Sequence, residues 1–437
     1  MSQYGAYGYA LHGKTYEWIL HHYYSGTRLG STNPNQIVRV LLQTGAAAFS
    51  GARKAGGKQL NPSLTYDVRP LVNGSVGVFT QTGKRVARSA APLVVSGTLP
   101  LDVAGLGQYR GDLEFRPDGT GGVETVNALG LDDYVRGVIS EEMPAGWSAQ
   151  ALEAQAVAAR TYAITTTVGG DGYNLYPDTR SQMYGGVKAE TPSTDAAVAA
   201  TSGQVVTYNG APVPTYFFNS SGGHTESIQN VWIGATPEPW LVGVPDPYDN
   251  AGGDPYHRWG SQMTTAAAQA KLRLLVKGTL IGIEVTEHGV SPRILTAEVV
   301  GTKGETTVTG GQLQQLFGLL TTYASFTTIS SAASTPPAAT ARDATAAVKA
   351  PSDARAIAAL LPLVKTLVAR AAEQLAGRVF PAPGRGTVAL ESETAKGWRH
   401  AASIKLGKNG AYAVTLPGPG TYRVVYRGLA GPSVSAG

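Results

Sequence analysis

The sequence predicts an α+β protein: a domain of mixed helices and strands with a β-rich insertion, followed by a small C-terminal module of β-sandwich type. Three observations predict this class. Residues 1–25 and 131–168 carry apolar side chains at helical spacing, whereas residues 26–128 hold short strand-like runs between glycine and proline turns. Beyond residue 380, further strand-like runs follow one another closely.

The first segment, residues 1–25, is expected to be helical because its apolar residues repeat every three or four positions. These residues are Tyr16, Ile19, Leu20 and Tyr23. The runs that follow, such as 37–42, 76–79 and 93–96, are rich in valine, isoleucine and leucine and predict strands. Residues 203–220 predict a β-hairpin, since Asn209-Gly210 is a two-residue turn signal between two apolar runs.

Composition changes near residue 330, where alanine, serine, threonine and proline dominate. We expect residues 1–329 to form one domain, with residues 330–350 as a linker. A helical segment is expected over 351–380, and the β-sandwich-like accessory module over 381–437. A chain ending near Ser331 is therefore expected to stay folded, with proteolysis cutting first between residues 330 and 350.

Composition and charge exclude several functions. The 437 residues include no cysteine, so the chain has no disulfide, thiolate nucleophile or cysteine-based zinc site. The net charge of +5 is spread along the chain without a Lys/Arg-rich run, which argues against a nucleic-acid partner. No apolar stretch approaches the ~20 residues of a transmembrane span. We expect no metal and no cofactor, because the seven histidines show no ligand spacing with acidic partners.

The strongest candidate for chemistry is Glu142, at the end of a predicted helix over residues 131–142. The apolar residues of this helix fall on one face, and Glu142 continues that face. Burial there would raise the pKa of the carboxyl, as a general acid requires. Glu141 points about 100° away and is expected to be solvated. The alternative for Glu142 is a helix-end carboxylate paired with a core arginine.

The next helix contributes two polar candidates, Gln155 and Arg160. Arg160 could pair with Glu142 or bind a sugar, and the alternative is a structural buried pair or a surface arginine. Five further residues complete the set of candidate substrate-binding residues. For each of them the alternative is an ordinary structural role in a turn or in the core. They are Gln182, Tyr184, Ser220 with Ser221, and His224. No strand-turn-helix elbow accompanies His224, so a nucleophilic serine is not supported.

These segments together resemble the SpoIID/LytB family over a core signature of about residues 110–325. The matching motifs are LDDYVRGV at 131–138, EMP at 142–144, ALEAQAVAARTY at 151–162, SQMYGG at 181–186 and NSSGGHTE at 219–226. The opening MSQYGA at 1–6 is similar to an element that closes the domain in many members, which suggests a permuted, actinobacterial-type arrangement.

The resemblance implies a SpoIID-type catalytic domain acting as a lytic transglycosylase on peptidoglycan glycan strands, stripped of stem peptides. The family's catalytic glutamate falls on Glu142 and its helix arginine on Arg160. A single carboxyl group would cleave the bond between N-acetylmuramic acid and N-acetylglucosamine and leave a 1,6-anhydro end. Ordinary glycoside hydrolysis uses two carboxylates instead.

Two other functions stay open from the sequence. One is a non-catalytic wall-binding protein that enhances a cell-wall amidase, a role associated with the LytB branch. The other is a structural or adhesive surface protein, suggested only by the C-terminal module. The resemblance implies an extracellular or cell-wall location. Met1 is expected to be an internal methionine, since neither an export signal nor the family's Gly- and His-rich loop precedes it.

Overall fold

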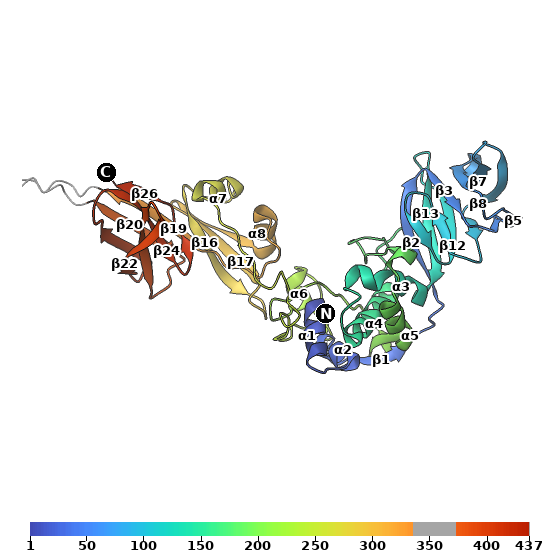
Figure 1. Ribbon diagram of the computed structural model, residues 1–437, viewed down its shortest axis with the longest axis horizontal. Helices are drawn as coiled ribbons and strands as arrows, with labels where there is room; N and C mark the ends of the chain where they lie inside the picture. The colour runs from blue at the N-terminus through green and yellow to red at the C-terminus, as the bar shows by residue number, and fades with distance from the viewer. Residues whose placement is uncertain (335–372, 437) are drawn as a thin grey trace, which may run out of the picture. The chain divides into compact units, whose positions relative to one another are not determined.

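The computed structural model describes residues 1–334 and 373–436 (Figure 1). The chain divides into two compact units, residues 1–259 and residues from 260 onward. Each unit has its own buried apolar clusters.

The helical part of the first unit is built around α4 (Ala149–Thr165). Four helices pack against α4 or its neighbours: α1 (Gln3–Leu11), α2 (Tyr16–Tyr23), α3 (Leu131–Glu142) and α5 (Pro192–Ala200). Figure 1 shows α3, α4 and α5 gathered side by side. Close packing is possible because α4 is rich in alanine, whose small side chain lets neighbouring backbones approach. The helical predictions for residues 1–25 and 131–168 are confirmed.

Two six-stranded antiparallel sheets occupy most of the chain between α2 and α3. The first follows the order β2 (Ile37–Gly45), β13 (Val123–Gly130), β12 (Asp112–Pro117), β9 (Leu93–Ser96), β4 (Lys54–Ala55), β5 (Lys58–Gln59). The second follows β11 (Gly107–Tyr109), β10 (Leu101–Val103), β3 (Ala47–Ser50), β6 (Tyr66–Pro70), β7 (Ser75–Thr80), β8 (Arg85–Ala90). Phe49 and Phe115, one from each sheet, are fully buried and their ring centroids lie 5.7 Å apart. The α+β prediction is confirmed.

A third sheet joins distant parts of the first unit. Strand β14 (Gln204–Tyr208) pairs with β1 (Arg28–Ser31) and with β15 (Ala211–Pro212). The predicted turn is present, with positive φ at both Asn209 and Gly210, as a primed two-residue turn requires. The second strand is shorter than expected because Pro212 and Pro214 have no N–H to continue the ladder.

The second unit contains two β structures. Strands β16 (Leu280–His288), β17 (Ile294–Gly301) and β18 (Gly304–Thr309) form a sheet that packs with α7 (Thr265–Lys271) and α8 (Gly310–Phe317) around the buried side chains of Leu272, Val299 and Leu313. Two further sheets share another apolar core. They are β19 (Thr328–Ser334)-β20 (Gln374–Phe380)-β23 (Ala411–Thr415) and β22 (Gly397–Lys405)-β21 (Thr387–Thr394)-β24 (Gly420–Tyr426)-β25 (Leu429–Ala430), with β26 (Val434–Ala436) on β24.

Three sequence-based boundaries need correction. The first compact unit ends at residue 259 and is therefore shorter than the single domain predicted over residues 1–329. Residues 330–334 belong to strand β19, not to a linker, and Ile329 is buried in the C-terminal core. Residues 374–380, predicted as helix, form β20, because pairing with β19 and β23 on both edges outweighs their local helical tendency. The rest of the predicted linker and helical segment, 335–372, lies outside the described residues.

Candidate functional site

Helix α3 presents Glu142 at the end of its apolar face. Its preceding face residues are all fully buried: Leu131, Tyr134, Val135, Val138 and Ile139. Glu142 itself is half-buried, and Met143 leaves the helix in an extended conformation before Pro144. The periodicity therefore places the Glu142 carboxyl where the apolar core meets the surface.

Two donors from distant segments hold the Glu142 carboxyl group. The backbone N–H of Met183 donates to Oε1 at 2.8 Å, and the side-chain amide of Gln3 donates from Nε2 to Oε2 at 3.3 Å. Each oxygen thus has one partner, so the orientation of the carboxyl plane is fixed.

Burial is the largest influence on this carboxyl and raises the pKa of Glu142 above its ordinary value. The hydrogen bonds from Met183 and Gln3 stabilise the charged form and oppose this rise, and the charge of Glu141 adds to it. Glu141 is exposed, as its position on the helix predicts. A raised pKa favours the protonated form, which is the form that a general acid needs.

Two predicted site residues, Gln182 and Tyr184, lie on either side of Met183 in the chain. Tyr184 is buried and its hydroxyl donates to Asn127 Oδ1 at 2.7 Å. Gln182 is buried too, and its Nε2 donates to the Tyr134 hydroxyl at 3.1 Å. Both side chains are buried, and they flank Met183 in the chain. The structure gives them the core role that the sequence left as the alternative.

Arg160 and Gln155 also lie in the core. Arg160 has no exposed surface, and its Nε donates to Asp132 Oδ1 at 2.6 Å. Its remaining contacts are with backbone carbonyls, including that of Gln204 at 3.2 Å. It pairs with Asp132, not with Glu142, which is the buried structural pair that the sequence left open. Gln155 is fully buried as well, so the expectation that Gln155 and Arg160 touch substrate does not fit this arrangement.

The loop of Ser220, Ser221 and His224 lies beside the start of α1. Phe218 and Asn219, just before this loop, accept hydrogen bonds through their carbonyls from the N–H groups of Gln3 and Tyr4. Ser220 is half-buried and its hydroxyl donates to Asn219 Oδ1 at 2.5 Å, whereas Ser221 is buried. His224 is half-buried. The loop therefore adjoins the segment that carries Gln3.

An aromatic cluster next to Gln3 was not identified from the sequence. The rings of Tyr7 and Trp147 stack with centroids 4.5 Å apart, and Tyr4 meets Trp147 edge-on at 4.8 Å. All three are half-buried, so each keeps some exposed ring surface. The only sequence signal was that Tyr4 follows Gln3 and Trp147 follows Glu142 by five positions. Half-exposed aromatic faces are a common surface for sugar rings, because apolar C–H groups can pack on them.

Within the described part of the chain, one group of side chains has the spacing to hold a metal ion. It consists of Asp249, Asp254 and His257, whose candidate ligand atoms lie within 4.8 Å of one another. The sequence-based expectation of no metal site overlooked the Asp254-x-x-His257 spacing.

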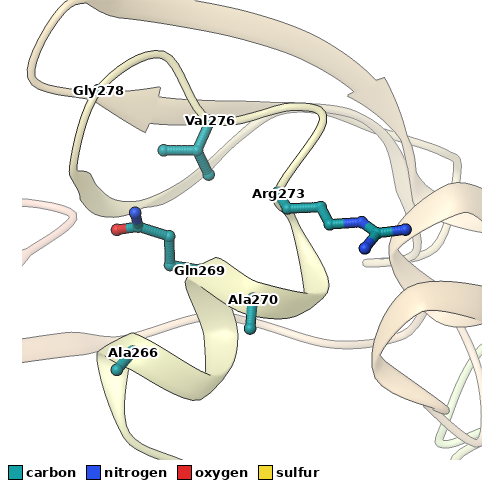
Figure 2. A pocket seen from close by; sticks show the side chains of 6 residues that line it. All are labelled: Ala266, Gln269, Ala270, Arg273, Val276 and Gly278. Atoms are coloured by element: carbon teal, nitrogen blue, oxygen red, sulfur yellow. The ribbon is translucent and has the colours of Figure 1, made fainter.

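A separate hollow in the second unit, with a volume of about 400 Å³, is lined by residues of α7 and the loop after it (Figure 2). Its lining is Ala266, Gln269, Ala270, Arg273, Val276 and Gly278. None of the candidate site residues lines it, so it gives no support to the chemistry at Glu142.

Comparison with known proteins finds similarity to stage II sporulation proteins and to an amidase enhancer. Residues 119–208 match the family model described as SpoIID, stage II sporulation protein. The chain is 44% identical over 103 residues to the amidase enhancer of Bacillus subtilis, which is 24% of this chain and 14% of that protein. It is 30% identical over 220 residues to stage II sporulation protein D of Bacillus subtilis, covering 45% and 60% of the two chains.

An uncharacterised protein of Brachyspira hyodysenteriae is 39% identical over 133 residues, which is 30% of this chain and 36% of the relative. The chain thus covers less than two thirds of the length of each of these relatives. Among the described helices, none combines the length and apolar character that crossing a membrane requires.

Proposed function

The chain belongs to the SpoIID/LytB family, and on that premise we propose that it is a lytic transglycosylase of peptidoglycan glycan strands. The observation that carries the proposal is the Glu142 carboxyl: half-buried, with a raised pKa, and held by one donor on each oxygen. These are the properties of a group that alternates between acid and base.

In the proposed reaction, protonated Glu142 donates its proton to the oxygen between N-acetylmuramic acid and N-acetylglucosamine. The bond from that oxygen to muramic C1 breaks, and N-acetylglucosamine leaves. The Glu142 carboxylate then takes the proton of the muramic C6 hydroxyl while O6 bonds to C1. The product is a 1,6-anhydro end, no water is consumed, and Glu142 returns to its protonated form.

The surroundings of Glu142 are compatible with chemistry that needs one carboxyl group. Two other acidic residues of the first unit, Asp178 and Glu190, are engaged in ion pairs. Asp178 pairs with Arg180 at 2.7 Å and Glu190 with Arg110 at 2.6 Å. Retaining and inverting hydrolases would place a second free carboxylate about 5–10 Å from the first. We propose that the aromatic rings of Tyr4, Tyr7 and Trp147 hold the glycan next to Glu142, in an extracellular or cell-wall setting.

A second function is favoured by one specific observation, the similarity to the amidase enhancer of Bacillus subtilis. Here the chain would bind glycan without cleaving it and increase the activity of a cell-wall amidase. Digestion of glycan strands stripped of stem peptides, followed by mass spectrometry, separates the two. New 1,6-anhydromuramic ends support the enzyme. Intact glycan, together with faster stem-peptide release when an amidase is added to whole wall, supports the enhancer.

A further inference from the structure

The segment over residues 246–257 carries an unusual concentration of buried acid. Asp246 and Asp249 have no exposed surface, and Asp254 is 6% exposed. His257, half-buried, completes the group in which Asp249, Asp254 and His257 bring their candidate ligand atoms within 4.8 Å of one another. Buried carboxylates are normally paired with cations, saturated by hydrogen bonds or bound to metal ions.

Both carboxylate oxygens of Asp249 have hydrogen-bond partners. Its Oδ1 accepts from the Ser2 hydroxyl at 2.8 Å and from the Ser221 N–H at 2.9 Å. Its Oδ2 accepts from the Gly222 N–H at 3.0 Å and lies 3.2 Å from His257 Nδ1. These donors stabilise the charged form and keep the pKa of Asp249 below its ordinary value despite burial.

Asp254 is not satisfied in the same way. Its Oδ1 accepts from the Tyr256 N–H at 2.8 Å, but its Oδ2 is buried and no donor in the described residues reaches it. No basic side chain within the described ranges forms an ion pair with Asp254 either. A buried acceptor without a partner destabilises the folded state, and more so when it is charged. This unpartnered oxygen belongs to the group that has ligand spacing, and a cation there would satisfy it.

We propose that Asp249, Asp254 and His257 bind one divalent transition-metal ion of the zinc type. Two carboxylates and one imidazole are a donor set that suits zinc, with water completing a tetrahedron. The imidazole disfavours calcium and magnesium, which take oxygen ligands. The competing account is a plain His257–Asp249 ion pair with no affinity for metal.

The position of this site gives the ion a structural role. Asp249 accepts from Ser2, the N-cap residue of α1, and the next residue, Gln3, donates to Glu142. A bound ion would therefore hold the 246–257 segment against the start of α1. It would thereby restrict the motion of Gln3, the hydrogen-bond partner of Glu142. The proposal concerns metal binding and does not depend on catalysis.

The test uses the full chain with any purification tag removed, stripped with EDTA and dialysed. Zinc is added during calorimetric titration and during thermal unfolding, with calcium and magnesium as parallel arms. We expect one zinc ion per chain and a melting temperature that rises with zinc concentration, as for any ligand of the folded state. Calcium and magnesium should give neither effect.

Asp254→Asn and His257→Gln should each weaken zinc binding at least tenfold. Asp171→Asn and His400→Gln, which change an exposed aspartate and an exposed histidine, are the matched controls and should bind zinc like the wild type. If a site variant fails to fold, cobalt added to the wild type gives a second measurement through visible absorption of tetrahedral cobalt. Failure of the wild type to take up one zinc, or zinc binding by both site variants at the wild-type affinity, would overturn the proposal whatever the outcome at Glu142.

Discussion

Gln3 Nε2 donates a hydrogen bond of 3.3 Å to Glu142 Oε2, joining the first helix of the chain to a carboxyl 139 positions later. Gln3 is only 4% exposed, so this donor is held in place by its surroundings. The contact makes the start of the chain part of the candidate site. It also opposes the rise that burial imposes on the pKa of Glu142.

Replacing Gln3 by methionine should shift the pH dependence of glycan cleavage. The amide N–H favours the Glu142 carboxylate, so its loss raises the pKa of Glu142 further. A general acid works in its protonated form, so activity is lost as pH rises through that pKa. The upper limb of the pH profile of kcat/KM should therefore move to higher pH in Gln3→Met. Gln108→Met, at an exposed glutamine, is the control, and an upper limb that stays in place or moves to lower pH contradicts the assignment.

Replacing Trp147 by alanine should weaken glycan binding more than it slows the chemical step. Trp147 contacts Tyr4 and Tyr7, whereas the hydrogen-bond partners of the Glu142 carboxyl are Gln3 and Met183. Loss of a stacking face typically costs about 0.5–1.5 kcal/mol beyond area burial. We expect KM for glycan strands to rise several-fold with kcat changed less. A large fall in kcat at unchanged KM would show that the aromatic cluster is not a binding surface.

Replacing Asp132 by asparagine should destabilise the first unit. Arg160 has no exposed surface, and Asp132 is its partner at 2.6 Å. Breaking a buried pair by removing one charge typically costs about 3–5 kcal/mol, because the other charge stays buried. Denaturant unfolding measures this change, with Asp133→Asn as the control, since Asp133 is 46% exposed and its loss should cost about 1 kcal/mol or less. Equal stability of the two variants would contradict a structural role for Arg160.

A fragment of residues 1–259 should fold alone. This range forms one compact unit with its own apolar cluster. Its thermal unfolding, followed by circular dichroism, should be cooperative. A fragment of residues 1–331 should instead keep part of β19 without its partner β20, which removes the cover of Ile329. We expect this longer fragment to aggregate more readily, since it leaves an unpaired strand edge. A non-cooperative 1–259 fragment would show that the division at 259 is wrong.

Local sequence patterns are sufficient to predict the structural features that depend on the spacing of neighbouring residues. The face of α3, the position of Glu142 at its end and the Asn209-Gly210 turn each follow from short-range spacing. The partners of Glu142 do not, because Gln3 and Met183 reach it from 139 and 41 positions away. A single sequence carries no signal for such contacts.

Two further differences have the same physical origin. The sequence makes Arg160 a candidate for substrate binding because it is a polar residue in an alanine-rich helix and matches the family's helix arginine. In the structure it is buried and paired with Asp132 of the adjacent helix. Residues 374–380 favour a helix locally but gain strand partners on both sides, one from before and one from after them in the chain. In each case, tertiary pairing outweighs the local preference.

We propose that Glu142 is the acid and the base of glycan cleavage, and a comparison of the wild type with two variants tests this role. Glycan strands stripped of stem peptides are digested with the wild type, Glu142→Gln and Glu141→Gln, and 1,6-anhydromuramic ends are counted by mass spectrometry. We predict that Glu142→Gln loses at least the roughly 10²–10⁴-fold that positioned proton transfer contributes, while Glu141→Gln, at an exposed site, stays near wild type. Cleavage by Glu142→Gln at the wild-type rate would contradict the account.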